Sequence, residues 1–262
     1  MTIENIVLPF DEGLRELPKS PYQLKGIKRP LIISDTHFRF HDKRAIEIAL
    51  THGKKINCDA IIMLGDMLDF YQVSFHDKNP GWSFMTDEIN IFREFLEFVR
   101  EKFKGVRLIF LEGNHDFRMK RYLWKNAPAI CGLEELHLTN LLHLRKHGVE
   151  FFDNGTVLKV GGLHLIHGNE LGMKGGINIA QTMLLRAMDS TLFGNFHKRQ
   201  SRDKTSISEK EYVVHAIGCL CTLRPLYFPV NDWQLGFADV EIDGKKFLVN
   251  NHRILSSDYS VV

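Results

Sequence analysis

Cysteine is scarce in this sequence and is not arranged for metal binding. The chain has four cysteines, at positions 58, 131, 219 and 221. The one close pair, Cys219 and Cys221, has the spacing C-x-C and lacks the second pair that a zinc knuckle requires. Because cysteine is among the residues most often buried, the pattern favours free, buried thiols.

Long apolar tracts, an export signal and a strong net charge are also missing. No run of about eighteen or more apolar residues could form a membrane-spanning helix. The opening residues lack the basic start and apolar core of a signal peptide. These absences predict a soluble, cytoplasmic protein with no membrane partner. The formal net charge is only +2, and no long basic stripe indicates duplex DNA, although a local patch is compatible with nucleic acid.

The composition is that of one globular domain. A chain of 262 residues, 44% hydrophobic and 25% charged, can bury a large core. No internal repeat or low-complexity tract divides it, so residues 1–262 are expected to form a single domain. A helix-rich stretch at about 122–147 is compatible with an insertion into that domain.

Short apolar runs bounded by glycine or polar residues predict buried strands. They lie at 30–34, 60–65, 107–113, 163–168 and 191–194. Helical patterns separate the early runs. Asp42 is a candidate N-cap for a helix that ends at Gly53, and Thr86 is one for a longer helix that stops at Gly105. The alternation of strand and helix indicates an α/β fold.

The last part of the chain is richer in strands. A helix is predicted over 177–188, followed by strand patterns at 211–220, 233–242 and 245–251. Asp243-Gly244 predicts the turn of a hairpin between the last two strands. We expect these strands to build a second sheet late in the chain.

Metal-binding residue types follow each of the five apolar runs. They are Asp35 and His37, then Asp66, then Asn114, His115 and Asp116, then His167, and finally Asn195 and His197. In open α/β sheets the carboxyl ends of the strands meet at one crevice, so groups far apart in sequence converge there. Such ligands, with one aspartate able to bridge, suit two divalent ions roughly 3.5–4 Å apart. Neighbouring glycines allow tight turns that bring ligands and backbone close. These glycines are Gly65, Gly113, Gly168 and Gly194.

A single histidine after a strand carries little weight, because the chain has thirteen histidines. An ordinary core or surface role is the favoured interpretation for His41, His52, His76, His137, His143 and His147. Five strand ends in series that all carry ligand types are a much stronger signal. The series therefore predicts a metal site.

The same residues resemble the motifs of the calcineurin-like metallophosphoesterases. SDTHF resembles the D-x-H motif, GDMLD the G-D-x-x-D motif, GNHD the G-N-H-[DE] motif, HLIHG the single-histidine motif and GNFHK the G-H-x-H motif. The match runs from about residue 31 to 200. It implies an α/β (α+β) four-layer sandwich, with two packed mixed β-sheets flanked by α-helices. The tail at 216–237 also resembles phage and bacterial members, and a phage-encoded protein would act in the host cytoplasm.

The resemblance implies a metal-binding role for seven matched positions. Asp35, His37 and His197 would hold one metal. Asp66 would bridge, and the second metal would be held by Asn114, His167 and Asn195.

The resemblance also implies residues that act on the substrate. His115 would protonate the leaving oxygen or stabilise the phosphate, with Asp116 placed to orient its ring. Asp69 would not bind a metal itself but would support the residues that do. Nearby basic residues are candidates for phosphate contacts, although a solvated surface role is at least as compatible with each of them. They are Arg118, Lys198 and Arg199.

The implied reaction is hydrolysis of a phosphoester by a hydroxide that bridges two divalent ions. Manganese is the preferred metal, with iron, zinc, nickel and magnesium as alternatives. One residue departs from the family pattern, because Asn195 stands where the G-H-x-H motif has its first histidine. An amide oxygen is a harder and weaker donor than imidazole toward transition metals, so we expect weaker binding of the second metal. The sequence does not distinguish a native Asn195 from a substitution made to trap a substrate.

The sequence defines the substrate less closely. The aromatic-rich segment 69–84 follows Asp66 and is compatible with a wall that stacks a base, or with a cluster packed under a loop. We expect a phosphodiester of a nucleotide or of single-stranded nucleic acid. A phosphomonoester or a lipid-linked sugar phosphate is the alternative. Asn195 also allows a metal-bound phosphate-binding protein without turnover, but His115 favours an enzyme because binding alone does not need it.

Overall fold

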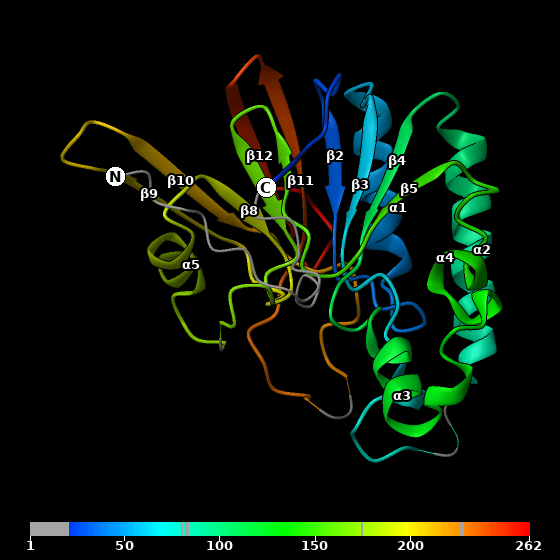
Figure 1. Cartoon of the computed structure of the whole chain (residues 1–262). Coiled ribbons are helices and arrows are strands. Elements are labelled where there is room, and N and C mark those ends of the chain that lie inside the picture. The colour runs from blue at the N-terminus through cyan, green and yellow to red at the C-terminus, as the bar shows by residue number, and fades with distance from the viewer. Residues whose placement is uncertain (1–20, 80, 82–83, 174, 226–227) are drawn as a thin grey trace, which may run out of the picture.

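The computed structural model describes residues 21–79, 81, 84–173, 175–225 and 228–262. Within these residues two six-stranded mixed sheets pack face to face, with helices on both outer faces (Figure 1). This arrangement is the four-layer sandwich that the family resemblance implied. Across the same described ranges, no helix is both long and apolar enough to cross a membrane.

The first sheet carries the early strands of the chain. Its order is β12-β11-β2-β3-β4-β5, in which β2 to β5 are parallel and the β11–β12 hairpin is antiparallel. The bounds are β2 Pro30–Ile33, β3 Ala60–Leu64, β4 Arg107–Leu111, β5 Val149–Phe152, β11 Leu235–Asp243 and β12 Lys246–Ile254.

The second sheet has the order β1-β6-β7-β8-β10-β9. Its bounds are β1 Tyr22–Gln23, β6 Leu158–Val160, β7 Leu163–Ile166, β8 Thr191–Phe193, β9 Gln200–Thr205 and β10 Glu211–Ala216. Strands β7, β8 and β10 are parallel to one another, so their carboxyl ends share one edge.

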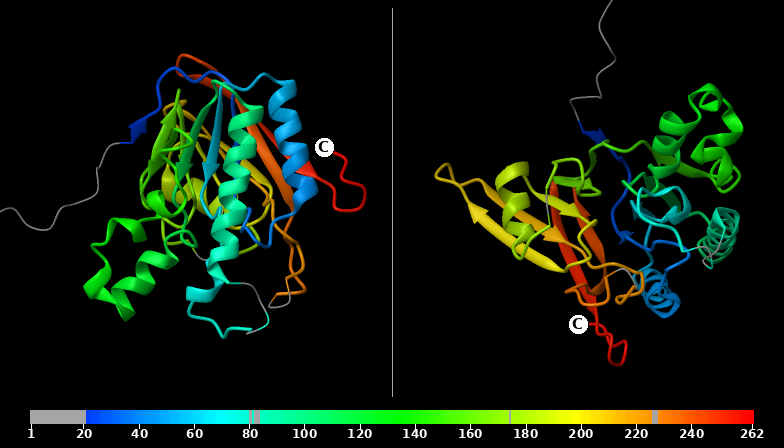
Figure 2. Two further views of the ribbon diagram at one scale, coloured as in Figure 1. Left: turned by 90° about the vertical axis from the view of Figure 1, so that its right-hand side faces the viewer. Right: turned by 90° about the horizontal axis from the view of Figure 1, so that it is seen from below.

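Helices cover the outer face of each sheet. Helices α1 (Lys43–Lys55) and α2 (Met85–Lys102) lie against the first sheet, and α5 (Ile179–Ala187) lies against the second (Figure 2). Short helices lie between β4 and β5: α3 (Arg118–Asn126), η2 (Pro128–Ile130), η3 (Glu134–Leu136) and α4 (Leu138–Leu141). A further turn, η1 (Tyr71–Val73), follows β3.

Three buried clusters fill the spaces between the four layers. One lies between α1, α2 and the first sheet, with Leu31, Ile46 and Phe92 among its members. The second lies between the sheets and includes Ile32, Ile62, Leu111 and Leu192, and the third joins α5 to the second sheet. Alternate residues of β2, such as Leu31 and Ile32, therefore face opposite cores, which explains why this strand is apolar throughout.

The five strands predicted from apolar runs are all present, and two predicted helix ends are wrong. Asp42 caps α1 as expected, because its carboxylate accepts the N–H of Ala45 at 3.0 Å. The helix continues past Gly53 to Lys55, however. A Cβ at Gly53 would lie only 2.9 Å from Leu31, so this glycine allows α1 to pack closely on β2. Thr86 lies inside α2, whose N-cap residue is Phe84.

The expected assembly of the late strands is only partly correct. The hairpin exists, but Asp243 still pairs with Lys246, so its turn is Gly244-Lys245, with Gly244 at φ +60°. This hairpin does not build a separate sheet, because β11 pairs with β2 and extends the first sheet. Strand β10 instead pairs with β8 in the second sheet, so the late strands are divided between the two sheets.

Candidate metal centre

Three buried donor groups from both sheets meet at the carboxyl ends of the strands. Asp35 follows β2, Asp66 follows β3, and His167 follows β7; one donor atom of each lies within 4.8 Å of the others. His167 Nε2 is 3.2 Å from Asp66 Oδ1. The backbone joins the loops, because Asp35 N donates to Gly65 O and His37 N donates to Asp66 O. This group forms one half of the candidate centre.

Two imidazoles form the other half. His37 Nε2 and His197 Nε2 are 3.1 Å apart, and the His197 nitrogen is 3.3 Å from Asp35 Oδ1. His37 Nε2 is 3.9 Å from both Asp35 Oδ1 and Asp66 Oδ2. Asp66 therefore presents one oxygen to each half, Oδ1 to His167 and Oδ2 to His37, as a bridging carboxylate would.

The backbone at this centre is strained. Five non-glycine residues at the predicted ligand positions have φ between 42° and 65°. They are Asp35, His37, Asp66, Asn195 and His197. Such left-handed conformations cost of order 1–3 kcal/mol each and persist where the surrounding structure enforces them, commonly at functional sites. The strain lies in the loops that follow β2, β3 and β8, where it sets the direction of the donor groups.

Two glycines allow the loops to approach one another. A Cβ at Gly113 would lie 2.3 Å from Asp66 Oδ1, and one at Gly194 would lie 2.6 Å from Asp35 Oδ2. Any side chain at either position would displace a carboxylate. The glycines predicted to bring ligands close do so by leaving room for them.

Two buried donor atoms in the centre lack a hydrogen-bond partner among the described residues. They are Asn114 Oδ1 and His167 Nε2. The His167 ring is oriented by its other nitrogen, because Nδ1 lies 2.8 Å from Leu64 O, which turns Nε2 toward the carboxylates. Buried polar atoms are normally paired. A divalent ion would satisfy both atoms, so the residues present fit a metal centre.

The electrostatic field of the centre favours a cation. Burial disfavours the charged form of His167, but the carboxylates of Asp66 and Asp35 outweigh it and raise the pKa of the ring to about 10. Burial also opposes the negative charge of Asp66, yet His167 and His115 hold the pKa of this carboxyl below its ordinary value. The buried aspartates therefore stay ionised and attract positive charge.

His115 stands at the rim of the centre, and Asp69 holds its ring. The Nδ1 of His115 is 2.8 Å from Asp69 Oδ1, and its Nε2 is 3.7 Å from Asp66 Oδ2. The Arg118 guanidinium donates to His115 Nε2 at 3.0 Å and to Asp69 O at 2.8 Å. Because arginine can only donate, Nε2 accepts here and Nδ1 carries the proton toward Asp69.

The family resemblance implied that Asp116 orients the His115 ring, but the carboxylate of Asp116 contacts backbone groups instead. Its carboxylate accepts the backbone N–H groups of Gly113 at 2.9 Å and Leu68 at 2.8 Å. It thereby ties the GNHD turn to the loop after β3. The backbone N–H of His115 in turn donates to Asp66 Oδ1 at 2.8 Å. Asp116 is a positioning residue for the loops.

The remaining predicted residues divide between the centre and the surface. Asn195 lies beside the centre, where its N–H donates to Asp35 Oδ2 at 2.9 Å. Arg118 reaches the centre, but Arg199 does not contact it, because its Nε donates to Asn251 O at 2.6 Å. Lys198 pairs with Asp232 at 2.6 Å. The phosphate contacts expected for these last two residues are not supported by their positions.

Two residues near the centre carried no ligand prediction. Cys221 Sγ is 3.9 Å from His197 Nδ1, and the sequence indicated only that its thiol is free and buried, which is correct. Glu170 accepts the backbone N–H groups of His167 at 2.8 Å and Gly168 at 2.6 Å. Its place three residues after His167 is a sequence signal that could have identified it.

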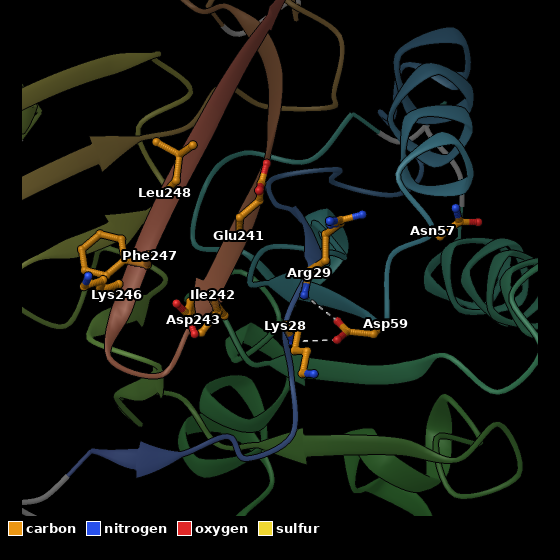
Figure 3. A pocket seen from close by; sticks show the side chains of 10 residues that line it. All are labelled: Lys28, Arg29, Asn57, Asp59, Glu241, Ile242, Asp243, Lys246, Phe247 and Leu248. Carbon is orange, nitrogen blue, oxygen red and sulfur yellow. Dashed lines mark hydrogen bonds between the residues drawn. The ribbon is translucent and has the colours of Figure 1, made fainter.

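A pocket of about 550 Å³ lies away from these residues, at the other end of the first sheet. Figure 3 shows its walls, formed by the start of β2 and by the β11–β12 hairpin. Asp59 accepts the backbone N–H groups of Lys28 and Arg29 there, at 2.6 and 3.0 Å. No histidine lines the pocket, and it shares no residue with the donor groups described above, so it is not the candidate centre.

Residues 28–217 match the family model described as calcineurin-like phosphoesterase. The chain belongs to this family. Membership supports a phosphoester hydrolase, and the dimetal dependence of the family agrees with the two donor groups that meet at Asp66. The matched range contains every predicted ligand.

This calcineurin-like phosphoesterase is similar to phage proteins. It is 25% identical to the Gene 54 protein of Mycobacterium phage L5 and 24% identical to that of Mycobacterium phage D29; each match covers 83% of the chain and 90% of the relative. Its fold is similar to that of Vacuolar Protein Sorting 29 from Cryptosporidium parvum. That match has a TM-score of 0.50 at 14% identity and covers 90% of this chain and 96% of the other.

Proposed function

We propose that the protein is a dimetal-dependent phosphodiesterase that acts on a nucleotide or a single-stranded nucleic acid. The position of Asp66 carries the proposal, because its two oxygens face His167 on one side and His37 on the other. When bound, two divalent ions would activate water for attack and neutralise charge on the phosphoryl oxygens. Mixed imidazole, carboxylate and amide donors suit manganese, which we propose as the natural metal, ahead of iron, zinc, nickel and magnesium.

The ligands divide between the two halves of the centre. Asp35, His37 and His197 would hold one ion, while Asn114, His167 and Asn195 would hold the other. The unpaired Asn114 Oδ1 and His167 Nε2 support the second assignment. Asp66 would contribute to both sites.

His115 would act on the leaving group. Its ring is oriented by Asp69, and Nε2 is the nitrogen nearer to the centre. Arg118 donates to that nitrogen, so a substrate phosphate that attracts the guanidinium would free Nε2. A protonated His115 could then donate from Nε2 to the leaving oxygen.

The segment after Asp66 supports a substrate with a base. Phe70 is buried in the core, but Phe75 is 85% exposed and Phe84 is 76% exposed. Positions 80, 82 and 83 of this segment lie outside the described residues. Lys78 is close enough to Arg118 for the arginine to depress its pKa, in addition to the larger effect of desolvation. Exposed aromatic rings and basic side chains on one segment are the elements that bind single strands and nucleotides.

A substrate panel tests the proposal. With manganese, we expect turnover of a cyclic nucleotide, an aryl phosphodiester and single-stranded DNA to exceed that of an aryl phosphomonoester. Phe75→Ala should raise KM for the base-containing substrates by roughly 5- to 150-fold, since stacking contributes about 1–3 kcal/mol per base. KM for the aryl diester should change little.

Phe98→Ala is the matched control, because Phe98 is an aromatic residue on α2 that is 46% exposed. It should leave every KM unchanged. Faster turnover of the monoester would contradict the diester assignment, and an unchanged KM in Phe75→Ala would remove Phe75 from the substrate site. Metal binding without turnover of any substrate would favour the phosphate-binding alternative.

Position 195 offers a second test. Histidine tolerates the left-handed backbone found there, with φ 65°, and imidazole binds manganese, iron or zinc better than an amide oxygen. Asn195→His should therefore tighten the second metal and raise activity, most visibly at limiting metal. Metal titration and turnover are the measurements. No tighter second binding event, together with equal or lower turnover, would make Asn195 a native adaptation.

The relatives from two mycobacteriophages support a proposed location. A phage-encoded protein of this kind would act in the cytoplasm of its host, which we propose as the compartment of this chain.

A further inference from the structure

We propose a separate metal site, of the zinc type, formed by His52, Asp239 and His252. One donor atom of each lies within 4.8 Å of the others. His52 Nε2 is 2.8 Å and His252 Nε2 is 2.6 Å from the same carboxylate oxygen, Asp239 Oδ1. Two imidazoles and one carboxylate form a donor set that binds zinc and related divalent ions.

The three donors come from three elements away from the catalytic residues. His52 lies on α1, Asp239 on β11 and His252 on β12, and α1 lies beside these strands in Figure 2. Asp239 pairs with Leu31, near the start of β2, whereas the catalytic ligands follow the end of that strand. The cluster therefore lies on the helix-covered face of the first sheet and shares no residue with the catalytic centre.

The surroundings of Asp239 prepare it for a cation. Its side chain is only 4% exposed, and Asn250 Nδ2 donates to the other oxygen, Oδ2, at 2.9 Å. This contact orients the carboxylate and leaves Oδ1 for the two imidazoles. Phe237 lies under both rings, with centroid distances of 5.1 Å to His52 and 4.8 Å to His252. The apolar floor limits where the rings can point.

The cluster needs little rearrangement to take an ion. Bonds of about 2.0–2.2 Å in a tetrahedral zinc site put neighbouring donor atoms roughly 3.3 Å apart, so each ring would move back by about half an ångström. Both histidine side chains are 21% exposed, so the cluster borders solvent, from which a fourth ligand such as water can come. A bound ion would then join α1 to the hairpin.

Zinc content provides the first test, and it does not depend on phosphoesterase activity. After equilibrium dialysis against zinc, the parent chain should hold one zinc more than the double variant His52→Gln/His252→Gln. Glutamine can still donate to Asp239, so the fold should survive. His215→Gln is the matched control, because His215 is also partly buried on a strand but its ring contacts the Ser201 hydroxyl. This control should hold as much zinc as the parent.

Thermal unfolding and cobalt spectra provide independent readouts. At zinc concentrations about 100-fold above its dissociation constant, one extra site multiplies the folded-to-unfolded ratio by roughly 100. Zinc should therefore raise the Tm of the parent more than that of the double variant. Cobalt should give the parent a visible absorption component that the double variant lacks.

Equal zinc content, equal thermal shifts and equal cobalt spectra in the parent and the variant would overturn the proposal. The cluster would then be a hydrogen-bonded network alone. If the double variant does not fold, the single variant His252→Gln decides the question by the same three measurements. Loss of catalytic metals in Asp66→Asn should leave the extra zinc in place, which separates this proposal from the proposed function.

Discussion

Replacing Asp66 with Asn is expected to reduce turnover to background and to lower the content of bound metal. The carboxylate faces both halves of the centre, with Oδ1 near His167 and Oδ2 near His37. An amide offers one neutral oxygen and cannot supply charge to two ions. The loss should exceed the roughly 10- to 100-fold effect that is usual for groups one step removed from a metal. Assays of turnover and elemental analysis of the same samples measure both effects.

The fold should survive this substitution, because the three apolar cores lie between the layers and not at the strand ends. Asp59→Asn is the matched control. Asp59 precedes β3 as Asp66 follows it, and its carboxylate accepts only the backbone N–H groups of Lys28 and Arg29. The control should keep its metal and its activity. Full metal content together with full turnover in Asp66→Asn would refute the bridging role.

Replacing His115 with Ala is expected to retain both metals and to lower the rate by about 10²–10⁴, the usual span for a positioned acid–base group. The ring stands at the rim, with Nε2 at 3.7 Å from Asp66 Oδ2, and it is held by Asp69 from behind. The loss should shrink for substrates with good leaving groups such as nitrophenolate, because these need no proton. Rates across a series of leaving groups, with metal content measured in parallel, test this expectation.

Two further variants sharpen the His115 experiment. Asp69→Asn should steepen the dependence on the leaving group less than His115→Ala does, since Asp69 acts by positioning the ring. Its metal content is measured in parallel, because Asp69 Oδ1 also lies 3.1 Å from His37 Nδ1. His164→Ala is the control, because His164 is partly buried on β7 and its ring contacts Ser190 O at 3.2 Å. It should leave the rate unchanged. An equal loss for good and poor leaving groups in His115→Ala would argue against proton donation and leave phosphate stabilisation as its role.

The sequence alone determined the strands and the end of the sheet where the centre lies. Short apolar runs bounded by glycine or polar residues, such as Leu108–Leu111, favour buried strands, and parallel strands bring their carboxyl ends to one edge. The residue types that follow them, in a fixed order, were enough to indicate the ligands and the family. These signals are local, so they can be read without knowing how the chain folds.

Contacts between distant segments were decided only by the tertiary structure. Asp116 directly follows His115 in the GNHD motif, whereas Asp69 lies 46 residues earlier, in GDMLD. Only the relative position of two loops assigns the ring to Asp69 and the backbone to Asp116. Arg199 follows a ligand in sequence, but its position beside β12 directs it to a backbone carbonyl. Proximity along the chain does not fix the direction of a side chain.

Strand pairing shows the same limit for the late part of the chain. The pattern of β11 and β12 predicted a hairpin but not its neighbour, because the alternation within a strand does not specify which other strand it pairs with. Because Asp239 pairs with Leu31, its side chain lies on the face of the first sheet that α1 covers. His52, Asp239 and His252 lie 187 and 13 residues apart along the chain. They meet only because the fold places a helix over two strands, and no local pattern contains that information.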